Sequence, residues 1–153
     1  MGSTALLRQV EFEAGAVITF LEICYTEAVK EPKRYIANAK ELLSKSPIED
    51  DRYTDEKYVK SACGVAYLGI LKAIEVRLQT KHGLTRKELP KKVEEYRKAL
   101  QKYVSVHNGK LLRAFDDLYD ELHIAGYYRG LLHHSGVLKE VLKRSSQFID
   151  KLK

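Results

Sequence analysis

Apolar residues recur through most of this chain at steps of three and four positions. That spacing gathers them on one face of an α-helix, whereas a half-buried strand would alternate apolar and polar residues. The predicted helices span residues 4–30, 33–44, 55–82, 90–105, 109–125 and 135–152. The expected fold is therefore all-α: an antiparallel up-and-down bundle with about four to five long helices and a short one, in a single domain.

Certain residues mark where these helices should begin and end. Pro32 either ends the first helix or begins the next, because proline fits best in the first turn of a helix. Residues 44–55 contain a proline and an acidic triplet, which is typical of an exposed loop. Gly83 is expected to end the helix before it, and Asn108 and Ser135 are expected to cap later helices.

The predicted helix 55–82 carries Gly64 and Gly69 in its interior. Each glycine costs a helix about 1 kcal/mol relative to alanine, so the pair indicates that another helix packs very close there. Cys24 and Cys63 lie on apolar helix faces and are expected to be small buried residues. They form neither a CxxC motif nor a zinc-ligand spacing, which fits reduced thiols in the cytoplasm.

No segment of the sequence predicts insertion into a membrane. The longest apolar run lies within residues 14–25, is interrupted by Glu22, and is shorter than the roughly 20 residues that span a bilayer. Glu11 and Glu13 precede it, where a secretory signal would carry basic residues. A cytoplasmic protein is expected.

Charge is distributed unevenly along the 153 residues. The chain contains 27 Lys and Arg residues against 21 Asp and Glu residues, a net charge of +6. Residues 1–31 contain two basic and five acidic groups, a net charge of −3, which leaves a net charge of +9 for the remainder. Within that remainder, residues 81–113 hold ten basic groups against three glutamates.

The basic segment 81–113 predicts a surface that attracts phosphate groups. Its candidate binding residues are Lys91, Lys92, Lys98 and Lys102. The alternative is a solvated helix face that keeps the protein soluble, in which Glu94 and Glu95 pair with neighbouring lysines.

A cluster of carboxylates with one histidine lies on the predicted helix 109–125. Its members are Asp116, Asp117, Asp120, Glu121 and His123. Asp120 and His123 have the spacing of half a di-iron site, but the sequence holds no second copy of that motif. Phosphate-binding loops, the zincin motif and the hydrolase nucleophile elbow are also absent from the sequence. Neither a metal nor another cofactor is expected.

Residues 127–136 read Tyr-Tyr-Arg-Gly-Leu-Leu-His-His-Ser-Gly and belong to a predicted break, from residue 126, before the last helix. Arg129 and His134 have the spacing of the Arg-x(4–6)-His motif, and the chain resembles the HEPN superfamily of small α-bundle proteins. The segment 57–78 resembles the small-residue-rich central helix of that superfamily, and 146–152 resembles its last helix. The resemblance implies a HEPN-like bundle, commonly a homodimer. Many members are metal-independent RNases, often toxins paired with a nucleotidyltransferase-type antitoxin.

The chemistry of Arg129 and His134 fits RNA cleavage without a metal. A histidine can move protons at the 2′-OH and the leaving oxygen near neutral pH. A permanently charged arginine can grip the phosphate in the transition state. The alternative is a glycine-rich surface turn, with Tyr127 and Tyr128 packed on the bundle and the histidines solvated.

Three further stretches, RYIANAKELL, KYVKSACGVAYLGIL and LHIAGYYRG, resemble a small uncharacterised bacterial family, mostly from Bacteroidales-type organisms, with no assigned activity. That resemblance covers most of residues 33–153, the HEPN-like core. Helix 1–31 is then an additional N-terminal element. Its apolar face needs cover from its own bundle or from a second chain, so a homodimer is expected.

Two functions remain open from the sequence. The first is a non-catalytic bundle that binds a partner protein, a nucleotide or an RNA backbone through its basic face, with Tyr128 and His133 as further binding residues. The second is a metal-independent RNase or toxin component that uses Arg129 and His134. The first hypothesis needs fewer coincidences.

Overall fold

The computed structural model describes the backbone of residues 3–105 and 109–153, and the side chains of residues 17–105 and 109–153. Within these ranges the chain forms five α-helices, two of which continue as wider π-helical segments, and one short β-hairpin. The elements are α1 (Ser3–Ser44), β1 (Ile48–Glu49), β2 (Arg52–Tyr53), α2 (Glu56–His82), α3 (Val93–Ala99), η1 (Leu100–Val104), α4 (Lys110–Leu118), η2 (Tyr119–Tyr128) and α5 (Ser135–Lys151).

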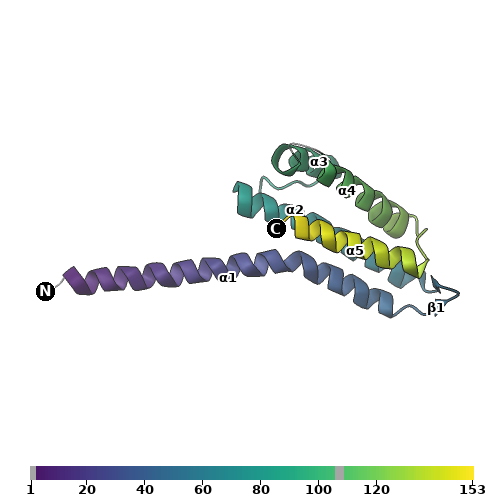
Figure 1. The fold of residues 1–153 in the computed structure, drawn as a ribbon, viewed down its shortest axis with the longest axis horizontal. Helices are drawn as coiled ribbons and strands as arrows, with labels where there is room; N and C mark the ends of the chain where they lie inside the picture. Colours follow the sequence, from purple (N-terminus) through teal and green to yellow (C-terminus); the bar gives the residue numbers. More distant parts are fainter. Residues whose placement is uncertain (1–2, 106–108) are drawn as a thin grey trace.

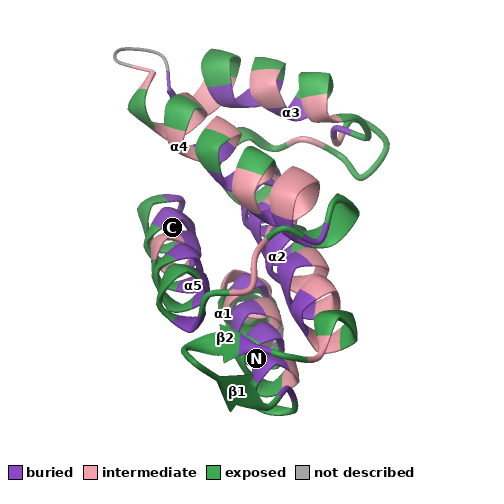
Figure 2. Ribbon diagram, turned by 90° about the vertical axis from the view of Figure 1, so that its right-hand side faces the viewer, coloured by how far each residue is buried: buried purple, intermediate pink, exposed green. Residues whose placement is uncertain are grey.

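The helices pack as an antiparallel bundle, which confirms the all-α prediction. Figure 1 shows that α1 and α2 run in opposite directions, as do α4 and α5. The central helix is α2, which contacts α1, η2 and α5, and its fully buried residues include Ile70, Ile74 and Leu78. Figure 2 shows the buried residues on the inward faces of α1, α2 and α5. Among the described helices, none combines the length and apolar character that a membrane span requires.

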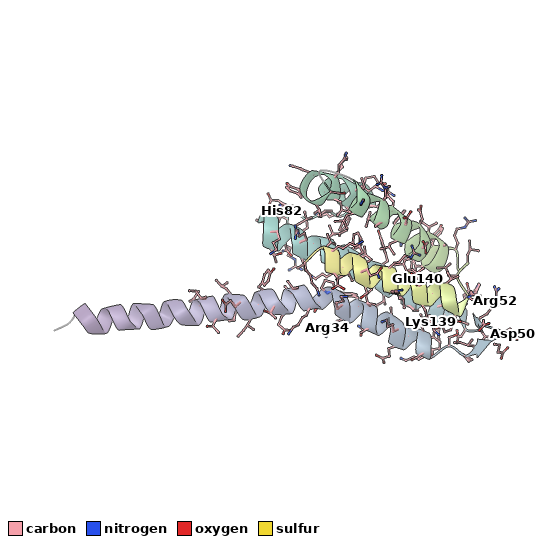
Figure 3. The ribbon with its side chains drawn as sticks, viewed as in Figure 1. Arg34, Asp50, Arg52, His82, Lys139 and Glu140 are labelled. Carbon is pink, nitrogen blue, oxygen red and sulfur yellow. The ribbon has the colours of Figure 1, made fainter. Side chains whose placement is uncertain are left out.

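α1 is one continuous helix of 42 residues, so the predicted division at Pro32 is wrong. An internal proline removes one helical hydrogen bond and crowds the preceding turn. Packing offsets this cost, because Pro32 is fully buried and the following turns contribute Ile36, Ala39 and Leu43 to the core. α1 changes direction in the region of Arg34 (Figures 1 and 3), which is the bend expected of an internal proline.

Residues 44–55 contain a hairpin where the sequence predicted only a loop. β1 and β2 pair antiparallel. Asp50 and Asp51 join them with φ angles of 47° and 60°, the left-handed conformation of a two-residue type I′ turn. Tyr53 is buried in the core, and its N–H donates to the His133 carbonyl oxygen at 2.8 Å. The hairpin is therefore tied to the segment that precedes α5.

α2 begins and ends as the sequence predicts. The side chain of Asp55 caps its N-terminus, and Gly83 ends it in the left-handed conformation with a φ of 68°. Gly69 lies where α1 approaches α2, and Gly64 lies under the ring of Tyr127. Both glycines therefore occupy the close helix contacts that their positions in the sequence indicate.

α3 begins later than the sequence predicts. Pro90 lies in the loop before the helix, which starts at Val93 rather than at residue 90. α3 then widens into η1, where the Ser105 N–H donates to the Leu100 carbonyl oxygen, five residues back, at 2.7 Å. The predicted cap Asn108 lies outside the described residues.

The segment between η2 and α5 is shorter than the predicted break. Gly126 lies inside η2, which continues to Tyr128. His134, not Ser135, caps α5, and its Nδ1 accepts the Gly136 N–H at 3.2 Å. An imidazole nitrogen can satisfy a free helix N–H in the same way as a carboxylate or hydroxyl oxygen.

Candidate functional site

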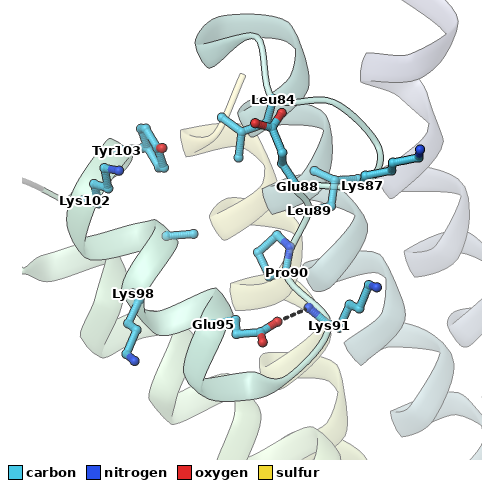
Figure 4. Close-up of a pocket in the computed structure, with 11 residues that line it drawn as sticks. Leu84, Lys87, Glu88, Leu89, Pro90, Lys91, Glu95, Lys98, Lys102 and Tyr103 are labelled. Carbon is cyan, nitrogen blue, oxygen red and sulfur yellow. Dashed lines mark hydrogen bonds between the residues drawn. The ribbon is translucent and has the colours of Figure 1, made fainter.

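A groove opens between the loop that follows α2 and the outer face of α3 and η1 (Figure 4). Its volume is about 520 Å³. The lining residues are Leu84, Lys87, Glu88, Leu89, Pro90, Lys91, Glu95, Lys98, Ala99, Lys102 and Tyr103. We call it the lysine groove, because four of these side chains are lysines.

Two contacts hold α3 on the bundle and fix one wall of the lysine groove. Tyr96 is buried, and its hydroxyl donates to Glu75 Oε1 of α2 at 2.6 Å. Arg97 Nε donates to Asp116 Oδ1 of α4 at 2.6 Å, and its guanidinium lies 5.1 Å from the centre of the Tyr119 ring. The groove lysines of α3 and η1 therefore extend from an anchored backbone.

The lysines of the groove are exposed. They are Lys87, Lys91, Lys98 and Lys102. In the part of the chain that the structure describes, none of the four forms an ion pair with a carboxylate. Figure 4 shows them around the rim of the groove. The lining carries these four lysines against Glu88 and Glu95, a net charge of +2, and an excess of positive charge around one concavity attracts an anion.

The two glutamates of the groove are bound to backbone amides. Glu95 Oε2 accepts the N–H groups of Lys91 at 2.6 Å and Lys92 at 3.2 Å. These bonds hold the pKa of Glu95 below its usual value. Glu88 Oε2 accepts from the N–H and the hydroxyl of Thr85, each at 2.7 Å, which likewise lowers the pKa of Glu88. The glutamates therefore shape the loop and begin α3.

Within the described residues, Glu94 and Glu95 do not form the ion pairs with neighbouring lysines that the alternative interpretation of the sequence predicted. Glu94 Oε1 lies 3.8 Å from Arg97, and Glu95 bonds the backbone of Lys91 rather than its ammonium group. Thr85 and Glu88, in contrast, have the spacing of a capping box, and they form local hydrogen bonds with each other.

The lysine groove also has an apolar and aromatic side. Leu84, Leu89, Pro90 and Ala99 line it between the lysines. The Lys102 ammonium lies 4.9 Å from the centre of the Tyr103 ring, and the His82 ring lies 5.1 Å from the same ring. A half-exposed tyrosine beside a lysine can stack on the ring of a ligand that also carries an anionic group.

The structure brings together most of the predicted basic residues. Lys91, Lys98 and Lys102 line the same groove, whereas Lys92 is the residue before α3 and lies outside the lining. Lys87 joins them, because the loop after α2 folds back toward η1. No sequence pattern distinguishes Lys87 from Lys92, since only the path of that loop decides which one faces the groove.

Arg129 and His134 lie at the opposite ends of the segment that joins η2 to α5. Arg129 is the C-cap residue directly after η2, and Gly130 follows it with a φ of 61° beside the Glu56–Lys60 ion pair. Both motif residues are exposed, and the described residues contain no hydrogen bond between them. The side chain of His134 is used as a helix cap.

Tyr128 and His133 occupy different surroundings in the same region. Tyr128 is 76% exposed, so it does not pack on the bundle. His133 is half-buried near Glu56. The hydrogen bond and charge of Lys60, and to a smaller extent His133, lower the pKa of the Glu56 carboxyl. Tyr127, in contrast, packs over Gly64 and stacks on His123.

The acidic cluster of α4 and η2 is largely used in structural contacts. Asp116 binds Arg97, and Glu121 binds Arg144 of α5. His123 stacks with Tyr67 at 4.8 Å between ring centres. Within residues 17–105 and 109–153, no group of three or more His, Cys, Asp and Glu side chains could hold a metal ion.

The two cysteines differ in their surroundings. Cys63 is buried against η2, and burial raises the pKa of its thiol to about 12. Cys24 is exposed, so the prediction that it is buried is wrong. It lies in the part of α1 that precedes the bundle.

The fold places the chain among small all-α helical bundle proteins. Residues 27–153 match the family described as a domain of unknown function (DUF5618), and the chain belongs to this family. A solved protein of unknown function from Dyadobacter fermentans is 32% identical to the chain, with a TM-score of 0.68. The similarity covers 84% of this chain and 94% of that one. The comparison with curated proteins finds no match.

Proposed function

We propose that the lysine groove binds the phosphate backbone of single-stranded RNA and that the protein is a non-catalytic binding module. The observation that carries this proposal is that four lysines without an ion pair in the described part of the chain, Lys87, Lys91, Lys98 and Lys102, line one groove of about 520 Å³. That volume lies in the range of ordinary ligand pockets, about 300–1,000 Å³. The groove therefore has room for at least part of a nucleotide as well as charge for its phosphate.

The residue types in the groove favour binding without sequence preference. Lysine meets phosphate as a point charge, whereas arginine, whose planar fork favours bidentate recognition of phosphate, is missing from the lining. Tyr103 supplies a ring on which any base can stack. Because single strands expose both their bases and their backbone, they suit this groove better than a duplex does. Such a ligand agrees with the cytoplasmic location expected from the sequence.

The proposal is tested by the binding of a fluorescent oligouridylate of about 12 nucleotides, followed by anisotropy. Charge reversal in Lys91→Glu/Lys98→Glu is expected to weaken binding about tenfold or more, because two phosphate contacts become repulsive. The matched control, Lys40→Glu/Lys139→Glu, makes the same change in net charge at exposed lysines outside the groove lining. Equal losses in both variants would refute the groove as the binding site.

The second proposal is that the protein is a HEPN-like, metal-independent RNase. The same RNA tests this activity. This second proposal rests on the Arg129–His134 spacing and on the resemblance of residues 57–78. If the protein only binds RNA, the oligouridylate is recovered intact after long incubation with EDTA. Cleavage that disappears in both Arg129→Ala and His134→Ala, with folding retained, would instead support the RNase and overturn the non-catalytic reading.

A further inference from the structure

The N-terminal part of α1 extends beyond the bundle, as Figure 1 shows. Every described side chain from Val17 to Glu27 is exposed. The large apolar side chains of this segment, which are 42–65% exposed, are Val17, Ile18, Phe20, Leu21, Ile23 and Tyr25. A helix whose apolar residues are open to water along several turns requires a partner.

The spacing of the apolar residues identifies the kind of partner. Residues 7–28 contain three heptads in which every first (a) and fourth (d) position is apolar. The a positions are Leu7, Ala14, Leu21 and Ala28, and the d positions are Val10, Val17 and Cys24. This 3.5-residue period, sustained over three heptads, is typical of a helix that pairs with another helix in a coiled coil.

The charged positions beside this seam permit pairing with an identical helix. In a parallel pair, each g position faces the e position of the next heptad on the partner. Those facing pairs are Leu6 with Glu11, Glu13 with Ile18, and Phe20 with Tyr25. No like charges oppose each other, and one pair is aromatic. The net charge of −3 over residues 1–31 disfavours the alternative, an anionic membrane surface.

We propose that two copies of the chain pair through residues 7–28 of α1 as a parallel coiled coil. Within the residues whose side chains the structure describes, the seam consists of Val17, Leu21, Cys24 and Ala28, and Phe20 of one copy packs against Tyr25 of the other. The N-terminal part of this segment projects beyond the bundle, and Tyr25, near its other end, lies 5.6 Å from the Lys81 ammonium of α2. The two bundles and their lysine grooves therefore lie at the same end of the dimer.

Substitutions on the seam test the pairing. In sedimentation equilibrium at about 100 µM, the wild-type chain is expected to have twice the mass of one chain, and Leu21→Glu the mass of one. Thr26→Glu introduces the same charge at the f position, away from the seam, and is expected to remain a dimer. Thermal unfolding of the bundle should be retained in both variants, because Leu21 and Thr26 are exposed. A monomeric wild type, or a dimer that Leu21→Glu leaves intact, would overturn the proposal.

Cys24 tests the parallel orientation. It occupies a d position, so the two Cys24 thiols of a parallel pair face each other across the axis, whereas an antiparallel pair separates them. The test adds the thiol oxidant diamide, which accepts two electrons and two protons from the two thiols as one S–S bond forms. A covalent dimer is expected in the wild type and in Cys63→Ser, and none in Cys24→Ser. A non-covalent dimer that diamide fails to cross-link would contradict the parallel orientation.

Discussion

Gly69 lies at a close contact between α1 and α2. A Cβ at this position would lie 2.7 Å from the Tyr35 Cβ and 3.2 Å from the Pro32 carbonyl oxygen. Neither atom can rotate away, because both belong to or adjoin the backbone of α1. Gly64 differs, since its neighbour is the half-exposed ring of Tyr127, which can move.

These surroundings predict opposite outcomes for two identical substitutions. Gly69→Ala gains about 1 kcal/mol of helix propensity but overpacks the contact at a cost of about 1–3 kcal/mol, so a net loss of stability is expected. Gly64→Ala is expected to be neutral or slightly stabilising. Urea denaturation of both variants measures the difference, and equal stability changes would show that α1 and α2 can move apart freely.

At the scale of residues, close helix contacts could be predicted from the sequence where they require a residue that destabilises its own helix. Gly64 and Gly69 weaken their helix, and this cost is detectable without a structure. The exposure of Cys24 could not be predicted, because its apolar neighbours look the same whether they face the bundle or water. Gly126 signals a break locally but lies inside η2, where a Cβ would come within 2.5 Å of Cys63 Sγ.

At the scale of elements, the N-terminus of α5 depends on His134. Its Nδ1 accepts the Gly136 N–H, a role usually filled by Asp, Asn, Ser or Thr. His134→Ala is therefore expected to lower the free energy of unfolding by about 1 kcal/mol, while His134→Asn, which retains an acceptor, should lower it far less. Chemical denaturation of the two variants compares them. Losses of the same size would show that the hydrogen bond contributes nothing.

The start of α3 depends on the ionised carboxylate of Glu95. Because the backbone N–H groups of Lys91 and Lys92 lower its pKa, its stabilising effect is complete above the unfolded-state pKa of about 4.3. The effect disappears as the pH falls through the lower pKa of the folded state. The stability difference between the wild type and Glu95→Gln should therefore be constant above about pH 5 and shrink in more acidic solution. A difference that does not change with pH would contradict this role.

Helix-forming segments were predictable because apolar periodicity extends over many residues. The β-hairpin and the continuity of α1 through Pro32 were not predictable. β1 and β2 have two residues each, too few to show an alternating pattern, and their turn uses Asp50 and Asp51 rather than glycine. Pro32 signals a helix end locally, but burial against the core overrides that signal.

At the scale of the whole molecule, charge is separated between an acidic projecting helix and a basic groove. The sequence predicted the basic segment and three of the four groove lysines as binding residues. It could not identify Lys87 or the contribution of Tyr103, because both depend on the path of the loop between α2 and α3. The pairing of Glu95 with backbone rather than with lysine likewise depends on that path.

The most direct test of the lysine groove is the dependence of RNA affinity on salt. Four phosphate contacts to a single strand predict that log K falls with log[KCl] with a slope of about −3. Lys98→Ala should reduce the magnitude of that slope by about 0.7, the contribution of one contact, while Lys139→Ala should leave it unchanged. A wild-type affinity that does not vary with salt, or the same slope in both variants and the wild type, would contradict phosphate binding in the lysine groove.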